Sequence, residues 1–364
     1  SKTRMGNMRR KQGILGGKGA WGAAVVLLVL LGLSLVAAVT FGTIALPVGD
    51  VYRVIGYALL GVGDPAVWGP GTAIHDVVLL IRLPRLVLAV AVGAGLSVCG
   101  AVMQAVVKNP LADPYVLGIS SGASLGASAA ILLGVGAALG SGYVGIVGAL
   151  GAFAVSLAVV AIANIGGRAN AVKLLLAGTA LSSVCGALSN FIIYFADNDH
   201  ALTQVVHWSM GSMAAADWES NRIIGAVVLL GVFFFWSQAR NLNLMLLGDE
   251  TAITLGTDMH RWRLLYLLVS SAVIGFVVYK AGMIGFVGLV IPHVVRMIFG
   301  TDHRKLIPLS ALLGALFLLW ADVLCRVVLP GNELPIGILT AMVGAPVFIY
   351  LMIRKQYGFG GREG

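Results

Sequence analysis

Long apolar runs separated by short polar segments make up almost the whole chain. The first run, Trp21–Phe41, holds about 20 residues, which is enough for a helix to cross the hydrocarbon core of a bilayer. Nine more runs follow, and two of them, Leu264–Tyr279 and Ala281–Val295, are short and lie beside glycine breaks. Such segments often form irregular helices near a transport path. The pattern predicts an all-α integral membrane protein with about ten transmembrane helices in one domain, residues 21–353.

The distribution of basic residues orients these helices. Ten spans place both termini on the same side of the membrane. If that side is the cytoplasm, 18 of the 24 lysines and arginines lie in inner segments, as the positive-inside rule describes. Residues 1–20 and 354–364 are therefore predicted to be cytoplasmic ends, and residues 240–263 a cytoplasmic loop. The six basic residues on the outer side are Arg53, Arg82, Arg85, Arg222, Lys280 and Arg326.

Composition agrees with a multi-pass protein of the cell (inner or cytoplasmic) membrane. Of 364 residues, 59% are hydrophobic and 11% are charged, whereas a soluble domain averages about 25% charged residues. The net charge of +9 follows from the topology and gives no reason to expect nucleic-acid binding. Gly118, Gly122 and Gly126 have the spacing at which small residues let membrane helices pack closely. The cysteines lie in apolar runs without CxxC spacing and are expected to be core residues: Cys99, Cys185 and Cys325.

The polar stretch at residues 240–263 is longer than a connection between two membrane spans requires. Asp249 and Glu250 open a short helical pattern within it, and Gly256 closes the pattern. Acids at a helix N-terminus complement the helix dipole, and glycine readily adopts the left-handed conformation that ends a helix. The two acids could serve this local purpose alone. A capped helix on a cytoplasmic loop also predicts a surface that another protein contacts.

Four stretches of the chain carry a family resemblance, and they are Arg82–Arg85 followed by Gly93–Gln104, Asn109–Ala123, Ile284–Arg296 and Glu333–Pro346. Together they closely resemble the FecCD-type permeases of type II ABC importers, which carry ferric siderophores, haem or cobalamin. The resemblance extends from about residue 21 to residue 353. It implies that family's ten-helix transmembrane fold and a homodimer in the lipid bilayer, with the path along the dimer axis. It also implies two cytoplasmic ATPase subunits and an external substrate-binding protein.

In this family, the loop between spans six and seven couples the permease to the ATPase, and residues 247–256 resemble that loop. Ile253 and Thr254 stand where the family pattern often has a basic or polar residue. The resemblance assigns the coupling role to Gly248, Asp249, Glu250, Ala252, Leu255 and Gly256.

Two short segments are predicted to narrow the inner end of the path. One lies in a double-proline break after the second span, and the other precedes the fifth span and resembles the family's inner gate. Ala171 stands where some relatives have a hydroxyl residue, which predicts a more apolar seal. The predicted gate residues are Asn109, Pro110, Leu111, Asn170, Ala171 and Val172.

Arg82, Arg85 and Arg326 lie at outer ends of spans, against the positive-inside trend. Arginines at the matching positions of the family meet acidic residues of the binding protein, so the resemblance assigns these three to docking. Two alternatives are open. The side chains could reach lipid headgroups, or Arg326 could pair with Asp322, which lies one helical turn away.

The sequence predicts no catalytic or metal site in this chain. It has no GxxxxGK[ST] motif, so we expect no cofactor here and expect ATP and magnesium to be used by the partner ATPase. No nucleophile–base pair or ligand cluster supports an integral-membrane enzyme. His293 is expected to be structural, and external His200 and His207 are spaced for one helix face but not for a tight chelate.

These observations predict the permease subunit of an ATP-driven importer. The expected cargo is an iron chelate, with a ferric siderophore favoured over haem and cobalamin. The alternative is an ion- or proton-coupled secondary transporter, which would normally need carboxylates within the bilayer. Asp322 is the one candidate for that role.

Overall fold

The computed structural model describes residues 17–115, 117–329 and 331–354, and all regular structure within them is helical. Seven helices in this part of the chain are long and apolar enough to cross a membrane, and three shorter apolar helices accompany them. Together they match the ten predicted runs in order, which confirms the all-α transmembrane fold. The long helices are α2 (Gly17–Ala38), the continuous helix Ala73–Val106 that includes α6 (Leu83–Val106), α8 (Tyr143–Asn164), α9 (Ala171–Tyr194), α11 (Trp218–Ser237), α14 (Met259–Ala281) and α16 (His303–Val327). The shorter helices are α7 (Ile119–Leu133), α15 (Val287–Phe299) and α17 (Ile336–Arg354).

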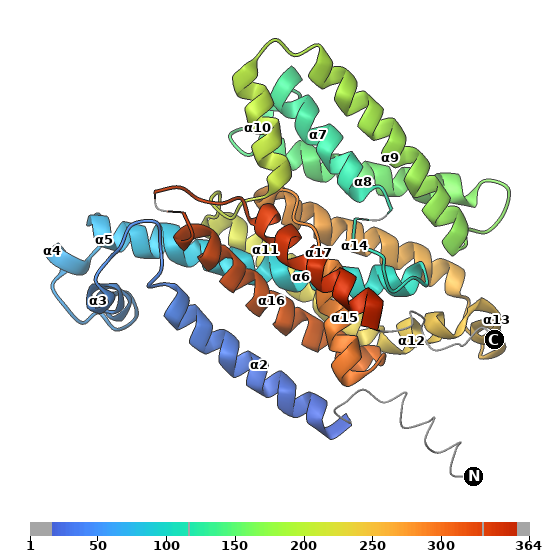
Figure 1. Ribbon diagram of the computed structural model, residues 1–364, viewed down its shortest axis with the longest axis horizontal. Helices are drawn as coiled ribbons and strands as arrows, with labels where there is room; N and C mark the ends of the chain where they lie inside the picture. Colours follow the sequence, from blue (N-terminus) through green and yellow to red (C-terminus); the bar gives the residue numbers. More distant parts are fainter. Residues whose placement is uncertain (1–16, 116, 330, 355–364) are drawn as a thin grey trace.

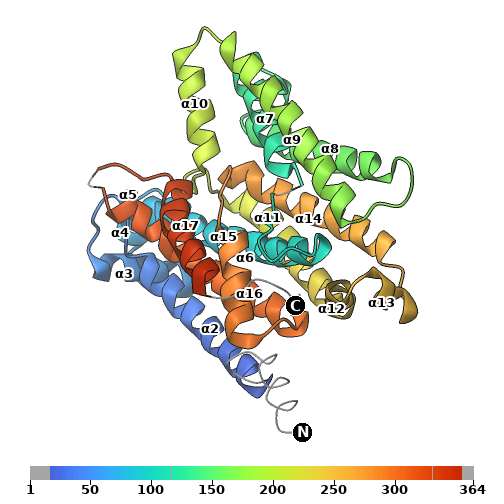
Figure 2. The ribbon, with the colours of Figure 1, turned by 45° about the vertical axis from the view of Figure 1, so that its right-hand side comes forward.

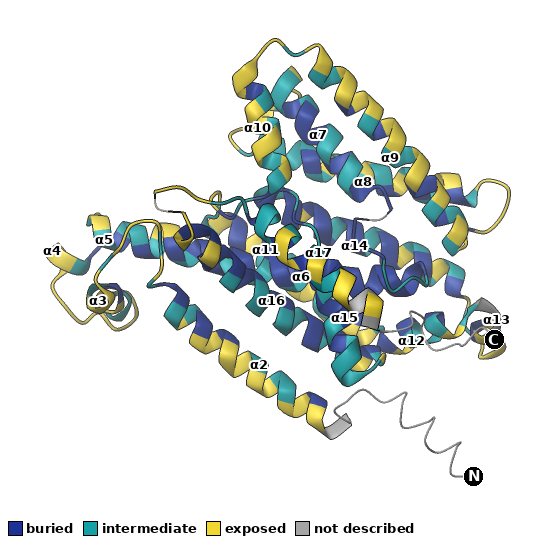
Figure 3. Cartoon of the chain, viewed as in Figure 1, coloured by how far each residue is buried: buried dark blue, intermediate teal, exposed yellow. Residues whose placement is uncertain are grey.

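Helix α6 lies at the centre of the bundle (Figure 1). It packs against α11, α14, α15 and α16, and its span has the largest buried share of the seven long helices. Helices α7, α8 and α9 form a second group, which meets the first mainly where α8 packs on α14. Figure 2 shows the same two groups after a turn of the molecule. In Figure 3, buried residues concentrate in α6 and α14, whereas α2 and α9 carry long exposed faces.

Glycines bring α6 and α16 into backbone contact. A Cβ atom at Gly93 would collide with the carbonyl oxygen of Gly314, and one at Gly314 would collide with Ser97. Small residues at a crossing let two membrane helices approach until their backbones touch. The outer ends of α6 and α16 are therefore held in a fixed relation.

The close helix packing that the sequence predicted for Gly118, Gly122 and Gly126 involves α7 and α8. Gly122 faces the carbonyl oxygen of Gly151, and Gly126 faces that of Val147, with no room for a side chain at either position. Gly118 has a different role, because it precedes α7 with a φ of 82°, a left-handed conformation that favours glycine. The predicted packing role is confirmed for Gly122 and Gly126.

The outer segment before the second span differs from the prediction. Arg82 and Arg85 were expected to lie at the outer end of this span. The structure has three short external helices, α3 (Val48–Leu60), α4 (Pro65–Trp68) and α5 (Ala73–Asp76). The last of these continues through the π-helix η1 (Val77–Arg82) into α6, as one helix of 34 residues. The predicted position of the outer end was wrong, because a π-helical turn directly before Pro84 carries the helix past the proline.

The two short runs also differ from each other. Helix α14 is a full span of 23 residues, so the prediction of a short helix there was wrong, because Arg263 is buried inside the helix and not in the preceding loop. Helix α15 has only 13 residues and follows Phe286, which has a left-handed φ of 69°. That irregular connection confirms the prediction for the second run. An additional helix, α10 (Asp199–Met210), lies in the predicted external segment and is capped by Asn198.

Candidate functional site

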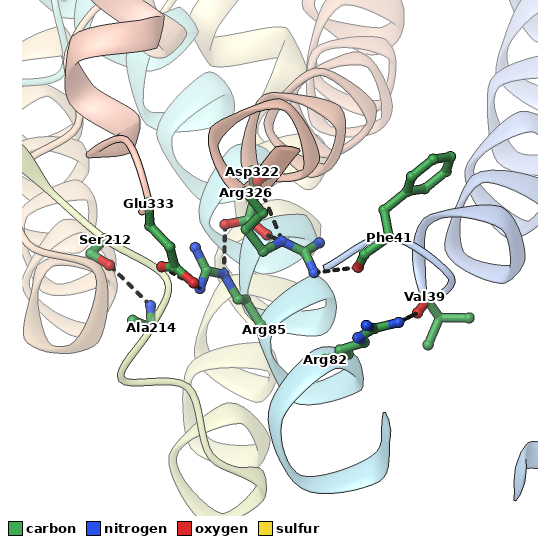
Figure 4. A network of polar contacts seen from close by, with 9 residues as sticks. All are labelled: Val39, Phe41, Arg82, Arg85, Ser212, Ala214, Asp322, Arg326 and Glu333. Atoms are coloured by element: carbon green, nitrogen blue, oxygen red, sulfur yellow. Dashed lines mark hydrogen bonds and ion pairs between the residues drawn. The ribbon is translucent and has the colours of Figure 1, made fainter. Parts of the chain in front are cut away.

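A cluster of charged side chains joins α6, α16 and the connection to α17 at the outer end of the bundle (Figure 4). Asp322 is fully buried at its centre. Its carboxylate accepts a hydrogen bond from Arg85 Nε at 2.8 Å and pairs with Arg326 Nε at 3.1 Å. Arg85 Nη1 also lies 2.7 Å from Glu333 Oε2. Because an isolated buried charge is costly, each member of this cluster depends on the others.

The same cluster holds the turn that follows α2. Arg82 donates hydrogen bonds to the carbonyl oxygens of Val39, at 3.1 Å, and Thr40, at 3.0 Å. Arg326 Nη1 donates to the carbonyl oxygen of Phe41 at 2.8 Å. Carbonyl groups at a helix C-terminus have no partner within the helix and carry its negative dipole end, so guanidinium groups stabilise them.

The three arginines of the cluster are consequently buried within the chain. Arg82 and Arg326 are 3% exposed and Arg85 is 6% exposed. Arg82 and Arg85 do not lie at the outer end of their helix as expected, since the helix begins nine residues before Arg82. The alternative pairing of Arg326 with Asp322 is present. Docking of a binding protein to these residues stays a prediction.

The sequence alone did not single out Glu333, the more exposed acid of the cluster. Its only signal was its place in the Glu-Leu-Pro stretch that carries the family resemblance. Asp322 was the candidate carboxylate for an ion-coupled transporter. It is paired with two arginines, so it offers no free carboxylate to a coupling ion in this arrangement.

The cytoplasmic polar stretch forms two short helices, α12 (Ala239–Leu247) and α13 (Asp249–Thr254), where the sequence predicted one. Gly248 separates them with a φ of 101°, and Gly256 follows α13 with a φ of 82°. The predicted helix end at Gly256 is confirmed. The backbone of Asp249 and Glu250 begins α13, and their side chains lie outside the described part of the structure.

One side of α13 is buried and the other is available for contact. Ala252 is fully buried, whereas Ile253 and Leu255 are 62% and 57% exposed. Exposed Thr254 lies beside them. The departure from the family pattern at Ile253 and Thr254 therefore falls on the exposed surface, which is more apolar than the family pattern predicts.

Asn243 ties α12 to the inner end of α16. Its side-chain nitrogen donates to Asp302 Oδ1 at 2.8 Å, and its Oδ1 accepts from the backbone nitrogen of His303 at 2.9 Å. Partial burial of Asp302 opposes its ionisation, but the hydrogen bonds from Asn243 and the Arg304 backbone nitrogen, with nearby positive charge, lower the pKa of Asp302 overall. Sequence reasoning missed Asn243, because its partners lie 59 and 60 residues away along the chain.

The predicted gate segments both form local turns. Asn109 Oδ1 accepts a hydrogen bond from the backbone nitrogen of Leu111 at 2.9 Å, and Asn170 caps α9 by accepting from the Lys173 nitrogen at 2.9 Å. Val172 is exposed in the first turn of α9. Caps of this kind fix the start of a helix. A gate between two copies stays a prediction.

The exposed face of α9 differs from that of α2. Thr179, Ser183 and Asn190 are exposed along α9 at spacings that place them on one side of the helix. The exposed face of α2 is apolar, with Val29 and Leu33 as examples. Apolar side chains such as Leu176 and Phe191 are exposed on α9 as well, so its exposed surface is mixed where that of α2 is apolar. On α10, His200 and His207 are exposed, whereas His293 is buried in α15.

We expect Asp322→Asn to destabilise the permease strongly, because it leaves two buried guanidinium groups without their shared carboxylate. Breaking a buried ion pair costs about 3–5 kcal/mol. Glu333→Gln removes a partly exposed partner and should cost at most about 1 kcal/mol. Thermal unfolding of both purified variants in detergent measures the difference. Equal losses of stability would contradict the central position of Asp322.

Known proteins resemble this chain over most of its length. The hemin transport system permease protein HmuU of Yersinia pestis is 42% identical over 293 residues, which cover 79% of this chain and 87% of HmuU. The vitamin B12 import system permease protein BtuC of Salmonella typhi is 42% identical over 275 residues, covering 76% of this chain and 83% of BtuC. The solved structure of an inward-facing metal-chelate type ABC transporter has a TM-score of 0.78 and 31% identity, and covers 92% of this chain and 99% of its own.

The FecCD transport family matches residues 27–354. That range contains all ten apolar helices except the first turns of α2, together with the outer charge cluster and the cytoplasmic helix pair. The chain belongs to the FecCD transport family.

Proposed function

We propose that this chain is the permease subunit of an ABC importer that takes its cargo from an external binding protein and moves it across the cytoplasmic membrane. The observation that carries the proposal is the helix pair α12–α13. It is fixed to α16 through Asn243, and it presents Ile253 and Leu255 at a surface where no membrane span requires apolar side chains. A separate ATPase subunit that uses ATP and magnesium would bind there, at the positions from Gly248 to Gly256.

The proposed cargo is a metal bound in a large organic chelate. HmuU and BtuC are named for hemin and vitamin B12, and the solved relative is described as a metal-chelate transporter. These three cargo descriptions share that chemical class. Within it, we propose a ferric siderophore first and haem or cobalamin next, as the sequence resemblance suggests.

A homodimer with its path along α9 would complete the transporter. The polar positions Thr179, Ser183 and Asn190 are exposed in a single copy, and polar side chains in membrane helices generally face neighbouring helices or water-filled cavities. The segments 109–111 and 170–172 would then narrow the inner end of the path between the two copies.

We expect Leu255→Glu and Glu250→Arg each to uncouple transport from ATP hydrolysis. Leu255→Glu places a charge on the apolar contact surface, and Glu250→Arg reverses the charge at the start of α13. Desolvating a charge at an interface without a partner typically costs 2–5 kcal/mol, or about 30-fold or more in affinity. Co-purification of the ATPase and uptake into proteoliposomes are the measurements. Arg261→Ala, at an exposed position of α14 outside the pair, is the control, and wild-type uptake in the two variants would contradict the coupling role.

The outer charge cluster is the proposed docking site of the binding protein. Arg85 and Arg326 pair with two carboxylates there, and Arg82 binds carbonyl oxygens beside them, so an acidic side chain of a partner would balance the remaining positive charge. Reversing Arg82 or Arg85 would break buried contacts of the permease, so such variants could not isolate docking from folding. Glu333 is the better position for a test because its side chain is partly exposed.

We expect Glu333→Gln to strengthen docking, because it increases the positive charge that a partner's carboxylate meets. A partly exposed pair contributes at most about 1 kcal/mol, so the gain should not exceed about fivefold. Binding of the purified binding protein to immobilised permease measures it. Asp50→Asn removes an external acid that pairs with exposed Arg53 and should leave docking unchanged. Weaker binding in Glu333→Gln would exclude this arrangement.

Val172→Cys should form a disulfide-linked dimer whose yield depends on the nucleotide state of the attached ATPase. The reason is that an inner gate must open and close during transport, which changes the distance between the two copies of residue 172. Non-reducing electrophoresis after mild oxidation is the measurement. Leu230→Cys, exposed on α11, is the control and should not cross-link. A yield that ignores nucleotide would count against a gate at this position.

A further inference from the structure

The external helix α3 has three different sides. Val51 and Val54 are fully buried against the core. Asp50 and Arg53 pair on an exposed polar side. The third side is apolar, and its exposed members are Val48, Tyr52 and Leu59. Tyr52 follows Val48 by four positions, and Leu59 follows Tyr52 by seven. This spacing places the three residues on one line along the helix.

Helix α3 lies across the direction of the membrane spans. In Figure 1 it is seen end-on, whereas α2 and α6 run across the picture. It follows the outer end of α2, and Tyr52 Oη donates a hydrogen bond of 3.0 Å to the carbonyl oxygen of Val36 near that end. Val36 belongs to the exposed apolar face of α2.

The apolar side of α3 therefore continues the lipid-facing surface of α2. A soluble external helix would expose polar residues on this side, but Val48 and Leu59 are 56% and 77% exposed. A helix with an apolar side, a charged side and a tyrosine at their border is typical of helices that lie in the membrane interface. The polar side, with Arg53 placed over Trp68, then faces water.

We propose that α3 is an interfacial helix whose face formed by Val48, Tyr52 and Leu59 is inserted among the lipids of the outer leaflet. In this position it fixes the depth of the outer charge cluster. Helix α3 packs directly against η1, whose last residue is Arg82. The contact of α3 with lipid determines the level of the membrane surface relative to the helix bundle. This contact does not depend on which cargo is transported.

The test compares two spin-labelled positions in the full-length permease in bilayer nanodiscs. Leu59→Cys places the label on the apolar side, and Arg53→Cys places it on the polar side of the same helix. The parent chain, whose three cysteines are buried, measures background labelling. The spin label collides with oxygen, which enters lipid, and with a water-soluble nickel chelate. The oxygen collision rate divided by the nickel-chelate collision rate should be several-fold higher at residue 59 than at residue 53.

Equal ratios at the two positions would overturn the proposal, because both sides of α3 would then face water. A rise at residue 59 that occurs only after the external binding protein is added would also overturn it and would make this face a protein-docking surface. Val48→Cys, at the other end of the same face, repeats the measurement. It must agree with Leu59→Cys for the proposal to stand.

Discussion

The close approach of α6 and α16 at Gly93 and Gly314 is the constraint on which the outer half of the molecule depends. With backbone in contact at that crossing, Arg85 on one helix reaches Asp322 on the other at 2.8 Å. Asp322 in turn holds Arg326, which binds the turn after α2. A larger residue at the crossing would separate the buried charges, and unpaired buried charges are far more costly than the packing defect itself. The buried ion pairs therefore depend on the close helix approach that the two glycines allow.

Helix α16 connects this outer cluster to the cytoplasmic helix pair. Its 25 residues span about 37 Å at 1.5 Å per residue, enough to cross the bilayer. The inner end is held to α12 by Asn243, and the outer end carries Asp322 and Arg326. A physical connection transmits a signal only if some element has two arrangements. Within the cluster, the contact of Glu333 with Arg85 is partly exposed, so it is the contact that the proposed docking of a binding protein would change.

The sequence was a good guide to features that depend on neighbouring residues. The apolar runs predicted the ten helices, and Gly256 predicted the end of α13. Both features could be predicted because each depends on residues that are neighbours in the sequence. The buried state of Arg82 was not predictable, because its partners are carbonyl groups of a turn about 40 residues earlier in the chain. The pairing of Arg85 with Asp322 joins residues 237 positions apart. Asn243 looked like an ordinary loop residue for the same reason: the groups that it binds are brought to it only by the packing of α12 on α16.

The exposed sides of α2 and α9 differ in polarity, so they suit different surroundings. The apolar side of α2 lies at one edge of the molecule in Figure 1, and α9 lies at the opposite edge. The hydroxyl groups of Thr179 and Ser183 donate to carbonyl oxygens within α9, but the side-chain amide of Asn190 would lose hydrogen-bonding opportunities in lipid, whereas Val29 and Leu33 on α2 would not. A second copy packed on the α2 side would bury only side chains that lipid already solvates. On the α9 side it would enclose the polar ones, and for this reason we propose the dimer axis beside α9.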